Sequence, residues 1–95
     1  GGLVLDQDAH AATLDGSPVE LTPTEFGLLG ALMARPGRVF SRLDLLEAVQ
    51  GDAYEGYERT IDVHIKNLRR KIEPDPRHPR FILTVFGVGY KFAQL

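Results

Sequence analysis

The residues whose types and spacing best suit a chemical role lie in the segment RTIDVHIKNLRRKI, residues 59–72. At the 100° turn per residue of an α-helix, four apolar residues form one narrow stripe. Such a helix can pack its apolar back on a core and present a basic front to the major groove of DNA, although the same pattern also fits a solvated amphipathic helix. The stripe contains Ile61, Ile65, Leu68 and Ile72; the front contains Arg59, Val63, Lys66 and Arg70, with Thr60 and Asn67 alongside and Arg69 and Lys71 on the flanks.

Charge is distributed unevenly along the chain, whose net charge is −2. Residues 1–58 carry three Arg against ten Asp and Glu, whereas residues 59–95 carry eight Lys and Arg against three acids. A locally basic end can attract phosphate even in a chain with negative net charge. The asymmetry therefore favours a nucleic-acid partner, although charge at one end of a chain can also serve only solubility.

Composition limits the class of protein. Ninety-five residues, 43% hydrophobic and 25% charged, are typical of one small globular domain covering residues 1–95. The absence of cysteine excludes disulfides and thiolate metal sites. No apolar run approaches the roughly eighteen residues of a membrane span, and no secretory signal opens the chain. We expect a cytoplasmic protein with no membrane partner.

Other candidate sites are weak. His10, His64 and His78 fall on an expected strand, helix and loop, which does not indicate a metal site. Gly87 and Gly89 join two expected strands rather than opening a helix, so they are better explained by a tight turn than by phosphate binding. The sequence therefore predicts no enzymatic activity, no metal and no cofactor.

Local patterns predict a small sheet, then three helices, then a hairpin. Short strands are expected at 3–5, 11–14 and 19–21, with Asp15-Gly16 as a two-residue turn. Thr22-Pro23-Thr24-Glu25 has the signature of a capping box opening a helix that ends near Arg35. A second helix should open at Ser41 and pack through Leu43, Leu46 and Val49. The third should run from about 58–59 to 73–74.

The C-terminal part predicts a proline-rich loop at 75–80, a strand at 81–86 and a returning strand at 90–92. Alternation along this strand places Phe86 on the same face as Ile82 and Thr84, while Phe81, Leu83 and Val85 share the other. Two interpretations of Phe86 stay open: packing at the base of the hairpin, or contact with the sugar edge of a minor groove.

Four phrases resemble the winged-helix effector domains of OmpR/PhoB-type response regulators. They are LTPTEFGLL at 21–29, PGRVFSR at 36–42, RTIDVHIKNLRRKI at 59–72 and TVFGVGYKF at 84–92, in family order and spacing. The resemblance spans nearly the whole chain. It implies an α+β winged helix-turn-helix with an N-terminal antiparallel four-stranded sheet, three helices and a C-terminal β-hairpin called the wing.

The resemblance also implies function and partners. The third helix would enter the major groove of duplex DNA, and the wing would approach the minor groove, to control transcription in a two-component system. Two copies would occupy tandem half-sites, and the loop 50–58 could touch RNA polymerase or a neighbouring subunit. A receiver domain phosphorylated on aspartate would precede this segment, so we expect an effector domain excised from a longer chain.

The resemblance assigns roles to individual residues. Val63, Asn67 and Arg70 match positions that face base edges, where Asn can pair with adenine and Val can touch a thymine methyl. Other residues match positions that contact phosphates or lie on the wing. Cations at such positions release counterions from DNA, and hydroxyl groups there form hydrogen bonds with its backbone. These positions are Arg59, Thr60, His64, Lys66, Arg69, Thr84, Phe86 and Tyr90.

Three positions depart from common family choices. Asn67 and Phe86 stand where arginines are frequent, and Gln50 stands where a Trp often reaches the DNA backbone. The base read by residue 67 is therefore expected to differ. The alternative function is a winged-helix module that binds protein through the same third helix, and a salt titration would separate the two because electrostatic DNA binding weakens steeply with salt.

Overall fold

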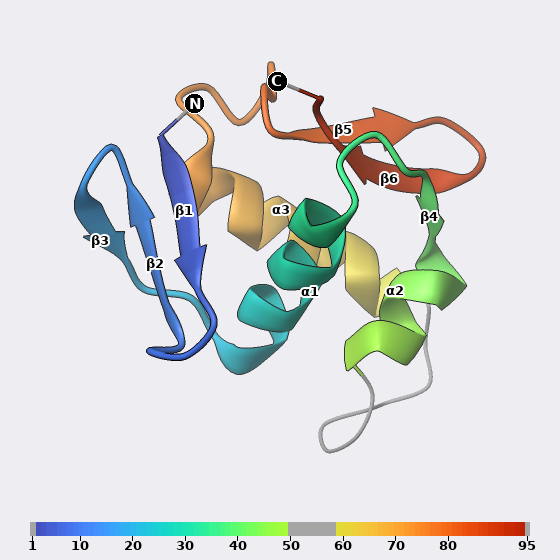
Figure 1. The fold of residues 1–95 in the computed structure, drawn as a ribbon. Coiled ribbons are helices and arrows are strands. Elements are labelled where there is room, and N and C mark those ends of the chain that lie inside the picture. Colours follow the sequence, from blue (N-terminus) through green and yellow to red (C-terminus); the bar gives the residue numbers. More distant parts are fainter. Residues whose placement is uncertain (1, 50–58, 95) are drawn as a thin grey trace.

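A computed structural model describes residues 2–49 and 59–94, with the side chain of Arg59 excepted. Within these residues a small sheet lies on one side of the helices and a long hairpin on the other (Figure 1). The expected order of sheet, three helices and hairpin is confirmed. The loop 50–58, for which we expected contact with RNA polymerase or a neighbouring subunit, lies outside the described residues, as does Gln50.

The N-terminal sheet is antiparallel and contains β1 (Leu3–Asp6), β2 (Ala11–Leu14) and β3 (Ser17–Val19) in that order. Asp15 and Gly16 connect β2 to β3 with φ of 51° and 85°. Positive φ at both central residues is the requirement of a type I′ hairpin turn, so the predicted turn is confirmed. The third strand ends at Val19, two residues earlier than expected.

The expected four-stranded N-terminal sheet is wrong, since this sheet has three strands among the described residues. The next short strand, β4 (Phe40–Ser41), joins a second sheet in the order β4-β6-β5, where β5 (Ile82–Val85) and β6 (Gly89–Phe92) form the wing. Gly89 permits this pairing, because a Cβ atom there would collide with the carbonyl oxygen of Phe40. Gly89 is thus a strand residue needed for close approach, and only Gly87, at φ 79°, is needed for the turn.

Each of the first two helices begins with a reciprocal cap. In α1 (Pro23–Ala34) the Glu25 amide donates to Thr22 Oγ1 at 3.1 Å, and the Thr22 amide donates to Glu25 Oε1 at 2.9 Å. In α2 (Arg42–Val49) Ser41 and Asp44 make the same pair of bonds at 3.0 Å each. Both predicted start signals are confirmed because each satisfies amides that have no partner inside the helix.

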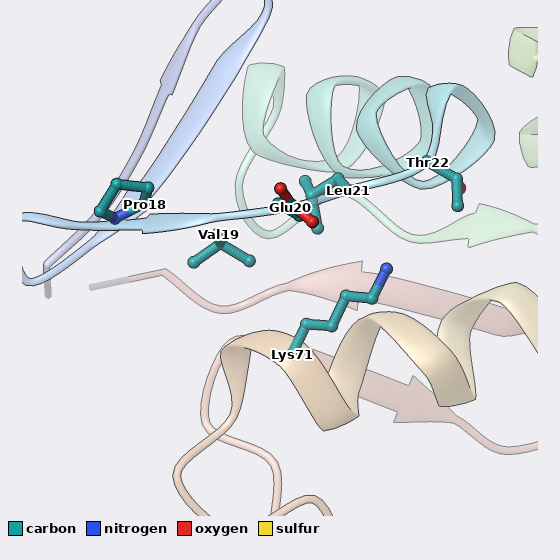
Figure 2. Close-up of a pocket in the computed structure, with 6 residues that line it drawn as sticks. All are labelled: Pro18, Val19, Glu20, Leu21, Thr22 and Lys71. Carbon is teal, nitrogen blue, oxygen red and sulfur yellow. The ribbon is translucent and has the colours of Figure 1, made fainter.

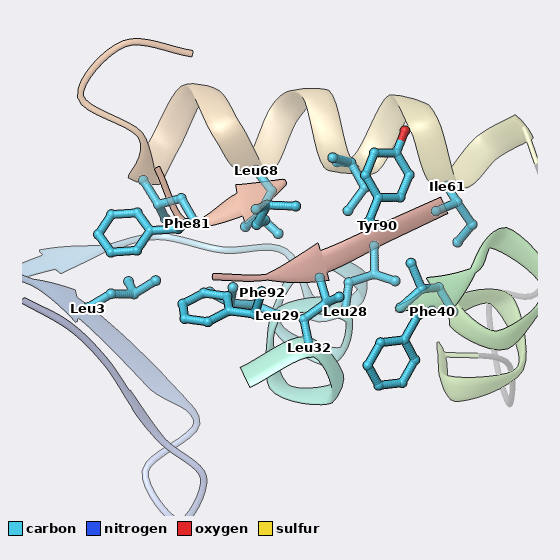
Figure 3. Packing of buried hydrophobic residues seen from close by; sticks show 14 of the residues in the cluster. Leu3, Leu28, Leu29, Leu32, Phe40, Ile61, Leu68, Phe81, Tyr90 and Phe92 are labelled. Carbon is cyan, nitrogen blue, oxygen red and sulfur yellow. The ribbon is translucent and has the colours of Figure 1, made fainter. Parts of the chain in front are cut away.

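The core lies where the three helices meet the wing (Figure 3). The helix α2 packs against both α1 and α3 (Arg59–Ile72), so its buried side is centred on Leu45 and Leu46. Leu43, which we expected on this packing face, is instead 48% exposed. The largest fully buried side chains are Leu28, Leu29, Leu32, Leu45, Ile61, Ile65, Leu68, Ile72 and Ile82.

Candidate nucleic-acid interface

The helix α3 has the two faces that its sequence predicts. Its apolar stripe, Ile61, Ile65, Leu68 and Ile72, is at most 1% exposed and faces α1, α2 and the wing. On the other side of the helix the apolar side chain of Val63 is 58% exposed, so it does not contribute to the core of this domain. The packing of the stripe fixes the rotation of α3, and therefore fixes which side chains point outward.

The predicted base-reading residues lie on this outward side. Val63 and Arg70 are exposed and Asn67 is half-buried. Among the predicted phosphate contacts on α3, Lys66 is exposed, while Thr60, His64 and Arg69 are half-buried; the side chain of Arg59 is outside the description. Lys71 points to a different side, where its Nζ lies 2.6 Å from Glu25 Oε1 beside the segment that enters α1 (Figure 2).

Arg69 links α3 to the wing. Its Nε and Nη2 donate to the carbonyl oxygen of Ile82 at 3.2 and 2.8 Å, and Nη2 also donates to Thr84 Oγ1 at 2.8 Å. Among the described strands β5 lies at the edge of its sheet, so none of them pairs with the outward carbonyl of Ile82. Two residues predicted as separate phosphate contacts, Arg69 and Thr84, are therefore bonded to each other, at the junction of helix and wing.

Glu73 supports the same junction, although the sequence indicated only that it ends the helix. Its side chain is 6% exposed and accepts hydrogen bonds of 2.7–3.1 Å from the backbone amides of Arg80, Phe81 and Ile82. The edge residue Ile82 is thus bonded through its amide to Glu73 and through its carbonyl to Arg69. No local pattern signals this role, because the acceptor and its donors are seven to nine residues apart in a turn-rich segment.

A second link joins the start of α3 to α2 and the wing. Asp62 Oδ1 accepts a hydrogen bond from Arg42 Nε at 2.7 Å and another from the Tyr90 hydroxyl at 2.6 Å. Burial, and then the bond to Asp62, raise the pKa of Tyr90, and the same carboxylate raises the pKa of Arg42. Tyr90, predicted to bond the DNA backbone, is 6% exposed and is tied to the protein by this bond. Sequence reasoning missed Arg42.

The wing ends in an exposed apolar tip. Phe86 is 91% exposed and Val88 is 47% exposed. The strand β5 stops at Val85, so the alternation that would pair Phe86 with Ile82 and Thr84 does not extend to it. The interpretation that Phe86 packs at the base of the wing is wrong, and the side chain is accessible at the tip.

The remaining histidines are used locally. The ring of His10 stacks on Phe26 with centroids 4.0 Å apart, and His78 Nδ1 lies 3.0 Å from Asp75 Oδ2. Within residues 2–49 and 59–94 no three His, Asp or Glu side chains gather as metal ligands would. None of the helices in the described part of the chain has the length and apolar character needed to span a membrane.

These features, a three-helix core, a basic third helix and a hairpin fixed beside it, define a winged helix-turn-helix domain. The family model for "Transcriptional regulatory protein, C terminal" matches residues 16–92. The chain belongs to this family, the OmpR/PhoB-type domains of response regulators.

Relatives and solved structures agree with this assignment. The chain is 46% identical over 91 residues to the DNA-binding response regulator MtrA of Mycolicibacterium smegmatis, covering 96% of this chain and 40% of that protein. The OmpR/PhoB homologue DrrB of Thermotoga maritima superposes with a TM-score of 0.89 at 37% identity, over 99% of this chain and 42% of that one. The RstA DNA-binding domain of Klebsiella pneumoniae, solved in complex with the RstA box, gives 0.85 at 34% identity, over 98% and 92%. This chain therefore spans about two fifths of MtrA.

Proposed function

We propose that this chain binds duplex DNA sequence-specifically as the effector domain of a two-component response regulator that controls transcription. The observation that carries the proposal is the arrangement of α3. Its outward side carries exposed cations, its opposite side is apolar and fully buried, and the wing is hydrogen-bonded beside it. The relative MtrA is a DNA-binding response regulator, and the similar RstA domain was solved on its DNA box. Family membership supports α3 in the major groove and the wing at the minor groove.

Within this proposal Val63, Asn67 and Arg70 read bases, because they lie on the side of α3 that points away from the core. Lys66, His64, Thr60 and Arg59 contact phosphates along the same helix. Base-edge contacts supply specificity, whereas phosphate contacts supply affinity that is independent of sequence. This division assigns different experimental signatures to neighbouring residues.

The wing residues contribute unequally to the proposed contact. The hydroxyl of Thr84 accepts a bond from Arg69, and a hydroxyl that accepts can still donate its proton to a phosphate. Tyr90 donates its proton to Asp62, so a bond from Tyr90 to phosphate requires that this internal bond be exchanged. Phe86 offers an exposed ring to the sugar edge of the minor groove.

The wider setting follows the family. Two copies occupy tandem half-sites and are brought together by receiver domains in a longer cytoplasmic protein, and the segment 50–58 meets RNA polymerase or a neighbouring subunit. The isolated domain binds duplex DNA without any cofactor. One recognition helix spans few base pairs, so each half-site is short and the isolated domain binds weakly as a monomer.

Selection from random duplex DNA, followed by a salt titration on the selected site, tests the proposal. About five to six phosphate contacts give a log–log salt slope of roughly −5, at about −0.9 for each contact. An Asn67→Ala variant should lose discrimination at one base position by about 1–3 kcal/mol, whereas Lys66→Ala should weaken all sequences alike and lower the slope by about one. A selection without an enriched motif, together with a flat salt response, would reject DNA binding and favour a protein-binding module.

A further inference from the structure

Arg77 lies in the proline-rich loop between α3 and the wing, outside every residue assigned to DNA so far. We propose that Arg77 is an additional phosphate contact, which binds the DNA backbone strand that separates the major groove from the minor groove. The inference rests on the proposed function, since it assumes that α3 and the wing meet duplex DNA. It extends the basic interface from α3 to the loop that follows this helix.

The loop holds Arg77 in a defined place. Asp75 accepts a bond from the Arg77 amide at 3.1 Å, and its own carbonyl accepts one from the His78 amide at 2.9 Å. Pro76 restricts the backbone before Arg77, because its ring fixes φ. Beyond the loop, buried Glu73 binds three successive amides at residues 80–82 and fixes the return to β5. The backbone of Arg77 is thus ordered before any ligand arrives, which reduces the entropy lost on binding.

Arg77 borders both parts of the proposed interface. One hollow is lined by Arg77, Pro76 and the α3 residues Asp62, Lys66, Arg69 and Arg70. A second hollow is lined by Arg77, Arg69 and the outer side of the wing, including Phe86 and Lys91. Among the described residues that line the first hollow, Asp62 is the one carboxylate, and it is already bonded to Arg42 and Tyr90. Cations therefore dominate the cleft between helix and wing.

Duplex geometry places a phosphate strand over this cleft. The two grooves of B-DNA are separated by the sugar–phosphate backbone, so a protein with one element in each groove must be crossed by that backbone between them. In this chain the crossing region is the junction of α3 and the wing, where Arg69 is bonded inward to Ile82 and Thr84. Arg77 supplies an exposed cation at the same junction.

Arg80 provides a matched control three residues away. It is also exposed, but its guanidinium carbon lies 5.6 Å from the centroid of the Phe81 ring, and it lines neither hollow. Arg77→Ala and Arg80→Ala change the net charge equally. Any difference between them in DNA binding therefore reports position and not total charge.

The test measures affinity for the selected duplex from 50 to 200 mM salt with the wild-type domain and both variants. Loss of one phosphate contact makes the log–log salt slope shallower by about 0.9. The affinity of the wild type should therefore exceed that of Arg77→Ala by about eightfold at 0.1 M salt. This affinity ratio should be about 3.5-fold smaller at 200 mM than at 50 mM salt. Arg80→Ala should stay within about twofold of the wild type. Neutral methylphosphonate groups placed singly along the duplex should reveal one position that weakens the wild type but not Arg77→Ala.

Equal affinity and equal slope for Arg77→Ala and Arg80→Ala would overturn the inference while leaving wild-type DNA binding intact. The absence of any wild-type binding to selected duplexes would instead overturn the proposed function. Circular dichroism melting of both variants excludes unfolding as a cause, because alanine at either position keeps the backbone amides that Asp75 and Glu73 bind.

Discussion

Replacing Arg69 by lysine tests whether the junction of helix and wing depends on the shape of a guanidinium and not only on its charge. Arg69 reaches two acceptors on β5, the Ile82 carbonyl and Thr84 Oγ1. A lysine ammonium is a compact charge without the planar fork of arginine. It can bond one of these acceptors well, but geometry prevents it from spanning both in the same way.

The expected loss follows from these bonds. Hydrogen bonds from charged groups contribute about 1.5–3 kcal/mol each, and a partly exposed site lies at or below the lower end. Arg69→Lys should therefore lower the free energy of unfolding by about 1–2 kcal/mol, from a total of about 5–14 kcal/mol expected for a domain of this length. The amides of β5 should exchange with solvent faster, because the edge strand loses part of its attachment to α3.

Urea denaturation of the free domain measures this change, with Arg70→Lys as the control. Arg70 is exposed at the adjacent position of α3, so the same substitution there should leave stability within about 0.5 kcal/mol of the wild type. Both variants keep the charge, so neither should change the salt slope of DNA binding by as much as one contact. If Arg69→Lys proved as stable as Arg70→Lys, the inward bonds of Arg69 would not matter to the fold.

Three further predictions concern the tip, the core and acid stability. Phe86→Arg should fold like the wild type because residue 86 is 91% exposed, and it should steepen the salt slope by about 0.9 and add a preference for A·T flanks in binding-site selection. Ile65→Ala, at a side chain 1% exposed, should cost about 2–5 kcal/mol in urea denaturation. Burial by itself raises the pKa of Glu25, but hydrogen bonds from Lys71 and the Thr22 backbone outweigh it, so the pKa is lowered. The ionised Glu25 side chain therefore stabilises the fold near neutral pH, and this stabilisation is lost as the pH falls below the ordinary glutamate pKa of about 4.3. Glu25→Gln should flatten that part of the stability–pH curve.

The parts of the fold that could be predicted from sequence are those set by neighbours on the chain. The apolar stripe of α3 repeats every three to four residues, and the two capping boxes join residues three apart, so both are visible without a structure. The Asp15-Gly16 turn is equally local. The outward position of Val63 and Lys66 then follows from the stripe alone. Their contacts with DNA stay predictions.

The parts that could not be predicted depend on residues far apart in sequence. The pairing of β4 with β6 joins Phe40 to Tyr90, and it removes the strand expected in the N-terminal sheet. The bonds of Asp62 span 20 and 28 residues. Leu43 has the right spacing for a buried helix face, yet α2 turns Leu45 and Leu46 inward because it meets two helices at once. Local periodicity carries no information about which partner a segment meets.

The fate of the three acidic residues after position 58 explains how a chain of negative net charge can present a basic surface. Asp62 accepts bonds from Arg42 and Tyr90, Glu73 accepts three backbone amides, and Asp75 accepts the Arg77 amide and contacts His78. Hydrogen-bond donors of the protein therefore lie close to each of these three carboxylates, and they partly compensate its negative charge. Of the eight Lys and Arg in the same region, five are exposed among the described side chains: Lys66, Arg70, Lys71, Arg77 and Arg80. The formal net charge weighs every charged group equally. An approaching phosphate, however, meets cations that are exposed and carboxylates that are already hydrogen-bonded, so the net charge underestimates its attraction to this surface.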